Sequence, residues 1–345
     1  MKIIILTFSK VNNYGANLQC YALAKVLQNL GHDVEILDYQ LKRSFVKNPI
    51  YNIFSYFQSK KFERFREKNL PPFTRHFIDY DDLKKNYPQA DCYIVGSDQV
   101  WNPNITKNAN VMAYFFEFLP KKIKKISYAA SFGIEEKDAF NNYSNIGDLL
   151  RSFDSIGVRE HTGVNLCKVL SGCDASLNVD PTILYGSFDN FVIPKETNNL
   201  YTFFFCHKKE YYDVARAVAR DRNYHAFILA QYKLVKEFRN IISISVDGWV
   251  NAIANSKFII TDSFHCTVFS ILFNRNFIVF NMPGKSDRVT TLLKELQLED
   301  RLCLGTDDYE KRKAQLLKPI DFSFANNKLC ELRKQSMDYL MKALS

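Results

Sequence analysis

The chain has 345 residues, 47% of them hydrophobic and 24% charged, with a formal net charge of +9. This length favours about two domains, and the low counts of 12 glycines and 10 prolines argue against disorder or an all-β repeat. Apolar runs stay below the roughly 18 residues of a membrane span, and eight scattered cysteines without a CxxC pair favour reduced thiols in the cytosol over disulfides or a zinc site.

The first predicted element is a strand at 2–8. Its apolar run imitates a signal peptide, but the run stops at Phe8 and Lys10 follows. A polar loop, NNYGAN at 12–17, then leads into a helix predicted at 18–30 and a strand at 34–37, which together form a βαβ unit. The loop lacks GxGxxG, so a dinucleotide site is poorly supported. Its amides could hydrogen-bond sugar hydroxyls or serve only to cap the helix.

An insert at 42–78 is basic and aromatic. From Lys42 to Arg75 it has nine Lys or Arg against Glu63 and Glu67, and it is rich in Phe and Tyr. Such a patch fits an anionic membrane face, and a solvated pair of helices resting aromatic rings on the core fits it equally well. No nucleic-acid motif accompanies it, so we expect no nucleic-acid partner.

Three further strands of the first domain, predicted at 92–95, 125–130 and 155–158, end in polar residues. Carboxyl ends of parallel strands meet at one edge of a sheet, where open sheets bind ligands. Asp98 and Gln99 would face a cleft there, or serve only as turn and capping residues. Arg159 could grip a carboxylate or phosphate with two bonds, or pair with Glu160.

We interpret 1–180 as an N-terminal α/β domain and 181–198, with its prolines and glycine, as a linker. A C-terminal α/β domain follows at 199–322, and a last helix at 323–345 would pack back on the first domain. In the second domain we expect strands at 201–206, 226–229, 241–245, 258–261 and 277–280, and helices at 210–220, 247–255 and 263–273.

The segment 258–273, FIITDSFHCTVFSILF, is a predicted buried strand leading into a helix. His265 would lie on the first helical turn, where backbone N–H groups and the helix dipole favour anions. An acid, a hydroxyl and an imidazole there suit a phosphorylated or carboxylated substrate. A capping role for Asp262 or Ser263 and a structural histidine are the alternatives. Lys285 and Arg288 follow the last strand as cations at the same edge, or as surface cations.

Six motifs occur in order: NNYGANLQCYAL at 12–23, VGSDQVWNP at 95–103, YAASFG at 128–133, GVRE at 157–160, VDPTIL at 179–184 and TDSFHCTVFSILF at 261–273. As a set, they resemble the polysaccharide pyruvyltransferase family, and the resemblance covers about 2–301. Together with the predicted elements it implies an α/β fold of two doubly wound Rossmann-like domains facing a cleft, which is a GT-B-like arrangement. The acceptor would lie on the side of 1–180 and the donor on the side of 199–322.

The resemblance implies transfer of a pyruvyl (carboxyvinyl) group from phosphoenolpyruvate to a sugar of a bacterial surface polysaccharide, such as a capsule or exopolysaccharide, or of its lipid-linked precursor. The products would be a pyruvate ketal and phosphate. The enzyme would be cytoplasmic, with peripheral association at the inner face of the membrane. No cofactor beyond the donor substrate is expected, and no metal, because no His/Asp cluster has ligand spacing.

Site residues follow from matching motif positions and strand ends. Arg159 matches the family arginine that holds the donor, and His265 matches the histidine of the serine-x-histidine signature, the expected acid/base group. Ser263 precedes His265 in that signature, and the further donor cation would be Arg288 or Lys285. Asp98 is a candidate base for the acceptor hydroxyl. The expected acceptor-binding residues are Asn13, Tyr14, Asn17, Gln19, Ser97, Asp98 and Gln99.

Two alternatives remain open at this point. One is a GT-B glycosyltransferase that uses a nucleotide sugar. The other is a non-catalytic protein that binds a glycan or an anion.

Overall fold

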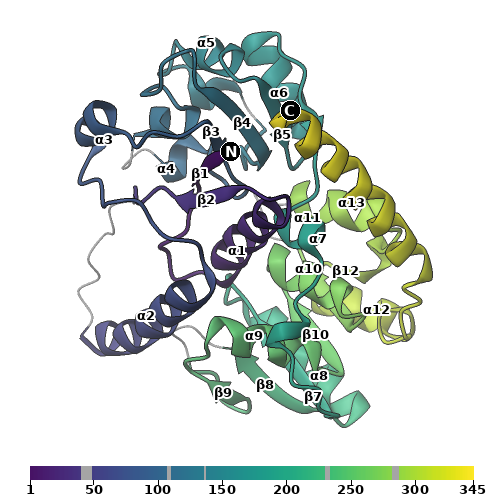
Figure 1. Ribbon diagram of the computed structural model, residues 1–345. Coiled ribbons are helices and arrows are strands. Elements are labelled where there is room, and N and C mark those ends of the chain that lie inside the picture. The colour runs from purple at the N-terminus through teal and green to yellow at the C-terminus, as the bar shows by residue number, and fades with distance from the viewer. Residues whose placement is uncertain (40–48, 107–109, 136, 230–233, 282–286) are drawn as a thin grey trace. The chain divides into compact units, whose positions relative to one another are not determined.

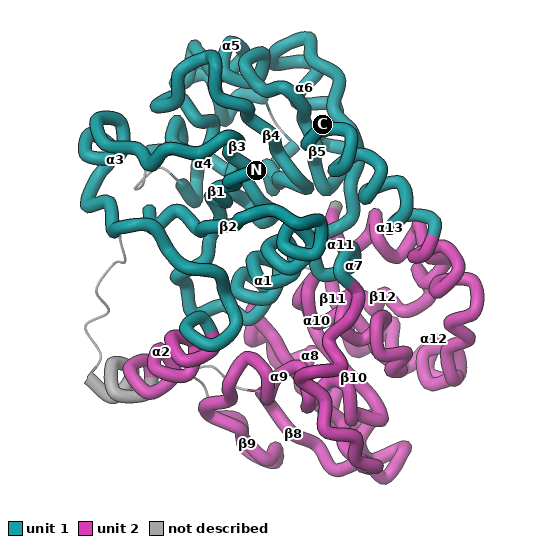
Figure 2. Tube along the Cα trace, in the orientation of Figure 1, with its two compact units in different colours: residues 1–45, 66–185, 331–345 teal, residues 46–65, 186–330 magenta. Residues whose placement is uncertain are grey.

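The computed structural model describes residues 1–39, 49–106, 110–135, 137–229, 234–281 and 287–345 (Figure 1). The chain forms two compact units (Figure 2). Unit 1 comprises 1–45, 66–185 and 331–345, and unit 2 comprises 46–65 and 186–330. Each unit is built on a six-stranded sheet in which all strand pairs are parallel. The expected α/β fold with two doubly wound sheets is therefore confirmed.

The sheet of unit 1 has the strand order β2-β1-β3-β4-β5-β6. Helices follow its strands on both faces, so the central strands are buried on both sides and consist of continuous apolar runs. Ile3, Ile4 and Ile5 of β1, for example, are fully buried. The strands are β1 (Lys2–Leu6), β2 (Asp33–Ile36), β3 (Cys92–Val95), β4 (Lys124–Ala130), β5 (Ser155–Val158) and β6 (Ser176–Leu177).

The first helix, α1 (Tyr14–Asn29), begins four residues before the predicted start at Leu18. The reason is a cap: the side chain of Asn13 accepts a hydrogen bond from the Ala16 N–H at 3.1 Å. The other helices wholly in unit 1 are α3 (Tyr80–Asn86), α4 (Pro103–Thr106), α5 (Ile146–Arg151), α6 (His161–Ser171) and α7 (Pro181–Tyr185).

The described part of the basic aromatic insert contains one long helix, α2 (Pro49–Asn69); residues 42–48 lie outside the described residues. Its first part belongs to unit 2 rather than to the first domain. Gln58 Nε2 donates to the Ile244 carbonyl at 3.0 Å, and Lys61 Nζ donates to the Ser243 carbonyl at 2.8 Å. These contacts explain why 46–65 groups with a sheet that is distant in sequence.

The sheet of unit 2 has the order β12-β11-β10-β7-β8-β9. The strand predicted at 241–245 ends earlier, because Ser245 caps α9 by accepting from the Gly248 N–H at 3.2 Å. The strands are β7 (Asn199–Phe203), β8 (His225–Leu229), β9 (Arg239–Ile241), β10 (Phe258–Thr261), β11 (Asn276–Phe280) and β12 (Leu302–Cys303). The helices are α8 (Lys209–Arg222), α9 (Val246–Ala254), α10 (Phe264–Leu272), α11 (Asp287–Glu295) and α12 (Thr306–Leu316).

The last helix, α13 (Ser323–Leu344), passes from unit 2 into unit 1 at residue 331. In unit 1 its buried side chains, among them Leu340, join the core formed by one face of the sheet. The Tyr339 hydroxyl donates to the Ser127 carbonyl of β4 at 2.8 Å. Among the helices in the described ranges, none is both long and apolar enough to cross a membrane.

The docking of α13 on unit 1 can be tested with two neighbouring residues. Leu340 is fully buried and Met341 is 53% exposed. We expect Leu340→Ala to lower the free energy of unfolding of the protein by about 2–5 kcal/mol, because it leaves a cavity in the core. Met341→Ala should change it by less than about 0.5 kcal/mol. Urea unfolding measures both, and equal effects would contradict the docking.

Candidate active site

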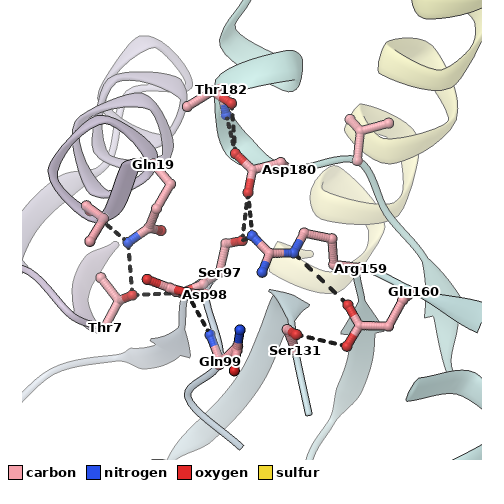
Figure 3. Close-up of polar contacts among 12 residues, drawn as sticks. Thr7, Gln19, Ser97, Asp98, Gln99, Ser131, Arg159, Glu160, Asp180 and Thr182 are labelled. Atoms are coloured by element: carbon pink, nitrogen blue, oxygen red, sulfur yellow. Dashed lines mark hydrogen bonds and ion pairs between the residues drawn. The ribbon is translucent and has the colours of Figure 1, made fainter. Parts of the chain in front are cut away.

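Polar side chains converge at the carboxyl edge of the sheet in unit 1 (Figure 3). Most of them come from the segments that follow β3, β4, β5 and β6, which lie next to one another in the sheet; Thr7 follows β1, and Gln19 lies in α1. The sequence predicted the first three of these segments as site elements. The labelled residues of the cluster are Thr7, Gln19, Ser97, Asp98, Gln99, Ser131, Arg159, Glu160, Asp180 and Thr182.

Arg159 is buried and forms an ion pair with Asp180. Its Nη1 atom lies 2.6 Å from Asp180 Oδ2 and 3.0 Å from Ser97 Oγ. Burial lowers the pKa of Arg159, but the surrounding carboxylates more than compensate, so the pKa lies above its usual value. Those carboxylates are Asp180, Glu160 and Asp98. The guanidinium therefore stays charged inside the unit.

Glu160, the partner that the sequence offered for Arg159, is mainly engaged elsewhere. Its Oε1 atom accepts from Ser131 Oγ at 2.7 Å and from the Phe132 N–H at 3.1 Å. Its Oε2 atom lies 3.9 Å from Arg159 Nε, at the outer limit of an ion pair. Asp180 is thus the closer counter-ion, and the motif VDPTIL was the only sequence signal that marked it.

Asp98 has an unusual backbone conformation, with φ of 84°. Aspartate visits this left-handed region more readily than most residues, and such strain gathers at functional sites. The Asp98 carbonyl accepts from the N–H groups of Val100 at 2.8 Å and Ser131 at 3.0 Å. Its carboxylate accepts from the Gln99 N–H at 2.8 Å. The half-buried Asp98 carboxylate is therefore fixed at the edge of the sheet.

The residues predicted for the acceptor have structural contacts of their own. Asn13 caps α1, and the buried Tyr14 begins it. Asn17 Nδ2 donates to the Val11 carbonyl at 2.8 Å.

Gln19 belongs to the same set, and its Nε2 donates to Thr7 Oγ1 at 2.9 Å. The Thr7 hydroxyl donates to the Ser97 carbonyl at 2.7 Å, and Gln99 Oε1 accepts from Asn102 Nδ2 at 3.1 Å. These contacts hold the loops of the edge in place, and sugar binding by these residues stays a prediction.

In unit 2 the segment after β10 starts α10 as the sequence predicted. Ser263 is the N-cap, and its Oγ accepts from the Cys266 N–H at 3.4 Å. His265 lies on the first turn of α10 and is buried. Asp262 accepts from the N–H groups of Phe205 and Cys206, both at 2.7 Å. Burial raises the pKa of the Asp262 carboxyl, and these bonds oppose the shift.

One aromatic ring links the predicted donor residues of unit 2. The guanidinium of Arg288 lies 5.7 Å from the centroid of the Phe264 ring, and the His265 ring lies 5.2 Å from the same centroid. Arg288 and His265 therefore both flank Phe264 at the start of α10. Lys285, the alternative cation, lies outside the described residues.

Arg159 belongs to unit 1 and His265 to unit 2. In the parts of the chain that the structure describes, no group of three or more His, Cys, Asp or Glu side chains is arranged to hold a metal ion.

Comparison with solved structures defines the class of fold. A UDP-GlcNAc 2-epimerase from Neisseria meningitidis bound to UDP-GlcNAc is 13% identical, with a TM-score of 0.56 over 99% of this chain and 100% of that chain. The 2-epimerase from Rickettsia bellii is 11% identical, with a TM-score of 0.54 over 99% and 96%. An alpha-glucosyltransferase in complex with UDP and DNA is 12% identical, with a TM-score of 0.50 over 97% and 99%. The chain has the GT-B fold that these enzymes share.

The family model for polysaccharide pyruvyl transferase matches residues 13–282, which is most of the chain. The chain therefore belongs to the polysaccharide pyruvyl transferase family, as the ordered motifs predicted. A search among curated protein sequences finds no match.

Asp262 offers a test of how the start of α10 is held. An asparagine has a single acceptor oxygen, so Asp262→Asn leaves the N–H of Phe205 or Cys206 without its partner. We expect a loss of about 1–3 kcal/mol in the free energy of unfolding and faster hydrogen exchange at that amide. The surface change Asp148→Asn, which removes an exposed pair with Arg151, should cost less than about 1 kcal/mol. Unchanged exchange at both amides in Asp262→Asn would contradict the contact.

Proposed function

We propose that the protein transfers a pyruvyl group from phosphoenolpyruvate to a sugar of a surface polysaccharide or of its lipid-linked precursor. The products are a cyclic pyruvate ketal and phosphate. The observation that carries this proposal is the family match over 13–282. The proposed setting is the bacterial cytoplasm, at the inner face of the membrane.

The start of α10 suits the donor chemically. Phosphoenolpyruvate carries a phosphate and a carboxylate on the same carbon skeleton, and both are anionic. A helix start offers N–H groups and the positive end of the dipole, and Arg288 adds a cation beside Phe264. We assign donor binding in unit 2 to Ser263, His265 and Arg288.

The reaction needs proton transfers that a histidine can perform. A proton is added to the methylene carbon, and a sugar hydroxyl attacks the adjacent carbon, which then has oxocarbenium character. The bond from this carbon to the phosphate oxygen breaks, and a second hydroxyl closes the ketal. The two hydroxyl protons are balanced by one on the new methyl group and one on phosphate. His265 is the proposed acid/base group, because imidazole exchanges protons near neutral pH.

Unit 1 supplies the proposed base and a second cation. The Asp98 carboxylate is fixed by its backbone contacts at the sheet edge, which suits a group that must meet a sugar hydroxyl in one orientation. Arg159 is the proposed donor contact of this unit, following its place in the GVRE motif. Four of the predicted acceptor residues, Gln19, Ser97, Asp98 and Gln99, lie around the same strand ends (Figure 3).

A nucleotide-sugar transferase shares the fold, and the likeness to UDP-binding enzymes supports the fold alone. Tight UDP binding with no response to phosphoenolpyruvate would favour that alternative. Ligand binding without turnover across a broad panel of acceptors would favour a non-catalytic protein.

Replacing His265 tests the proposed chemistry. We expect His265→Gln to lower kcat for phosphate release from phosphoenolpyruvate by roughly 10²–10⁴-fold, because glutamine cannot exchange a proton. The matched control is His225→Gln, since His225 is exposed at the start of β8 and should not affect turnover. The assay couples phosphate release to an acceptor glycan. Full turnover by His265→Gln would remove the assigned role.

The outer face of α2 supports the proposed contact with the membrane. Tyr56 and Phe57 are each 59% exposed. Phe57, Lys60 and Arg64 recur at spacings of three and four, so they lie along one face of the helix, and both cations are exposed. Aromatic and basic side chains on one helical face suit an anionic bilayer interface.

Vesicle binding tests this contact. We expect co-sedimentation with phosphatidylglycerol vesicles at low salt, and little with phosphatidylcholine alone. The double variant Lys60→Gln/Arg64→Gln should bind about 30-fold more weakly, since each basic residue near an anionic surface contributes about 1 kcal/mol. The control Ile193→Ser removes an apolar side chain of unit 2 that is 77% exposed and should leave binding unchanged. Equal recovery of the wild type in the supernatant with both lipids would contradict the contact.

A further inference from the structure

We infer that Asp180 is a positioning residue for the transfer reaction: it sets the orientation of the Arg159 guanidinium and, through Ser97, of Asp98. This inference rests on the proposed function, in which Arg159 contacts the donor and Asp98 the acceptor.

Both carboxylate oxygens of Asp180 are engaged within unit 1. Oδ2 accepts from Arg159 Nη1 at 2.6 Å and from Ser97 Oγ at 3.0 Å. Oδ1 accepts from the Thr182 N–H at 3.0 Å and from the Thr182 hydroxyl at 2.7 Å. One oxygen therefore faces the site and the other is attached to the first turn of α7, so the carboxylate cannot rotate without losing contacts at both ends.

The backbone around Asp180 is equally constrained. Its carbonyl accepts from the N–H groups of Ile183 at 2.9 Å and Leu184 at 3.0 Å, which ties the residue to α7. Pro181 fixes its own φ and restricts the residue before it. Asp180 is 1% exposed, and Thr182 is fully buried. The anchor is therefore a packed part of the unit, and the carboxylate has a defined position relative to the strand ends.

Ser97 connects the Asp180–Arg159 pair to Asp98, the next residue in the chain. The Ser97 hydroxyl contacts Asp180 and Arg159, and the Ser97 carbonyl accepts from the Thr7 hydroxyl at 2.7 Å. The residue before Asp98 is thus fixed at its side chain and at its backbone. Asp98 itself has φ of 84°, a conformation that persists only when the surrounding structure imposes it.

Glu160 and Asp98 also carry negative charge near Arg159, but Asp180 is the ion-pair partner of its guanidinium. Glu160 Oε2 lies 3.9 Å from Arg159 Nε, and its other oxygen is bonded to Ser131 and Phe132. Without the Asp180 charge, the guanidinium would be drawn toward Glu160 and Asp98. A displaced cation at a donor contact weakens donor binding even when the fold is intact, because alignment of the reacting groups is lost.

The test uses purified variants and steady-state kinetics with phosphoenolpyruvate and an acceptor glycan. We expect Asp180→Asn to raise the KM for phosphoenolpyruvate by about tenfold or more and to lower kcat, because the charge-assisted bond to Arg159 is lost. Asp180→Glu restores the charge but displaces it by one methylene. It should therefore keep a counter-charge for Arg159 without recovering the wild-type KM.

The matched control is Asp38→Asn. Asp38 is also a buried aspartate of unit 1 with a cationic partner, Lys10, at 2.5 Å, and no role in the reaction is assigned to it. We expect this variant to lose stability while keeping the wild-type KM. An Asp180→Asn enzyme that melts at a lower temperature but keeps both KM and kcat would overturn the positioning role.

If Asp180→Asn does not fold, Ser97→Ala decides the question, since it removes one of the two site-facing contacts of Asp180. We expect a smaller rise in KM or a fall in kcat, and unchanged values for both would overturn the inference. Wild-type protein that does not turn over phosphoenolpyruvate with any acceptor would overturn the proposed function itself. Wild-type turnover with unaffected Asp180 variants would overturn only the role of Asp180.

Discussion

The Arg159 guanidinium is buried inside unit 1, so its charge needs a carboxylate close by. This requirement determines how the polar side chains at the edge of the first sheet are arranged. Removing one partner of a buried ion pair typically costs about 3–5 kcal/mol, because the other charge is left in a poorly solvated place. Asp180 is the near partner of Arg159, at 2.6 Å. Its remaining oxygen is bonded to Thr182, so the charge pair also fixes the start of α7. Glu160 and Asp98 add negative charge near Arg159, and Asp180 remains its ion-pair partner.

In unit 2, a buried carboxylate is stabilised by backbone N–H groups. Asp262 is buried, and the N–H groups of Phe205 and Cys206 bind its carboxylate. This contact joins the end of β7 to the end of β10, which are neighbours in the sheet. The start of α10, with Ser263 and His265, is held at the same edge as a result. Parallel topology explains why both units collect polar side chains at their strand ends.

Much of the fold could be predicted, because the parallel strands are buried on both faces and leave continuous apolar runs in the sequence. β3 and β10 coincide with the predicted 92–95 and 258–261. β6 and β12 were missed, since strands of two residues leave no such run. The grouping of 46–65 with unit 2 was missed as well, because it depends on contacts with residues near 244 that no local pattern records.

The candidate site was predictable at the level of strand ends and motifs. The partners of these residues were not predictable: the counter-ion of Arg159 lies 21 residues further on, at the last residue of the segment interpreted as the N-terminal domain. The capping contacts of Asn13 and Ser263 were foreseen as alternatives to ligand binding, and both occur. A side chain that caps a helix in the free protein can still meet a ligand, so these contacts leave the predicted roles to experiment.

The measurement that bears most directly on pyruvyl transfer follows the oxygen that joins phosphorus to carbon in phosphoenolpyruvate. With this bridging oxygen labelled as ¹⁸O, and with a lipid-linked or polymeric glycan as acceptor, mass spectrometry can locate the label in the products. Transfer by cleavage of the carbon–oxygen bond predicts that all label leaves in phosphate and that the glycan gains one unlabelled pyruvyl ketal. Label retained on the glycan, or phosphate release without any gain in glycan mass, would contradict the proposed reaction.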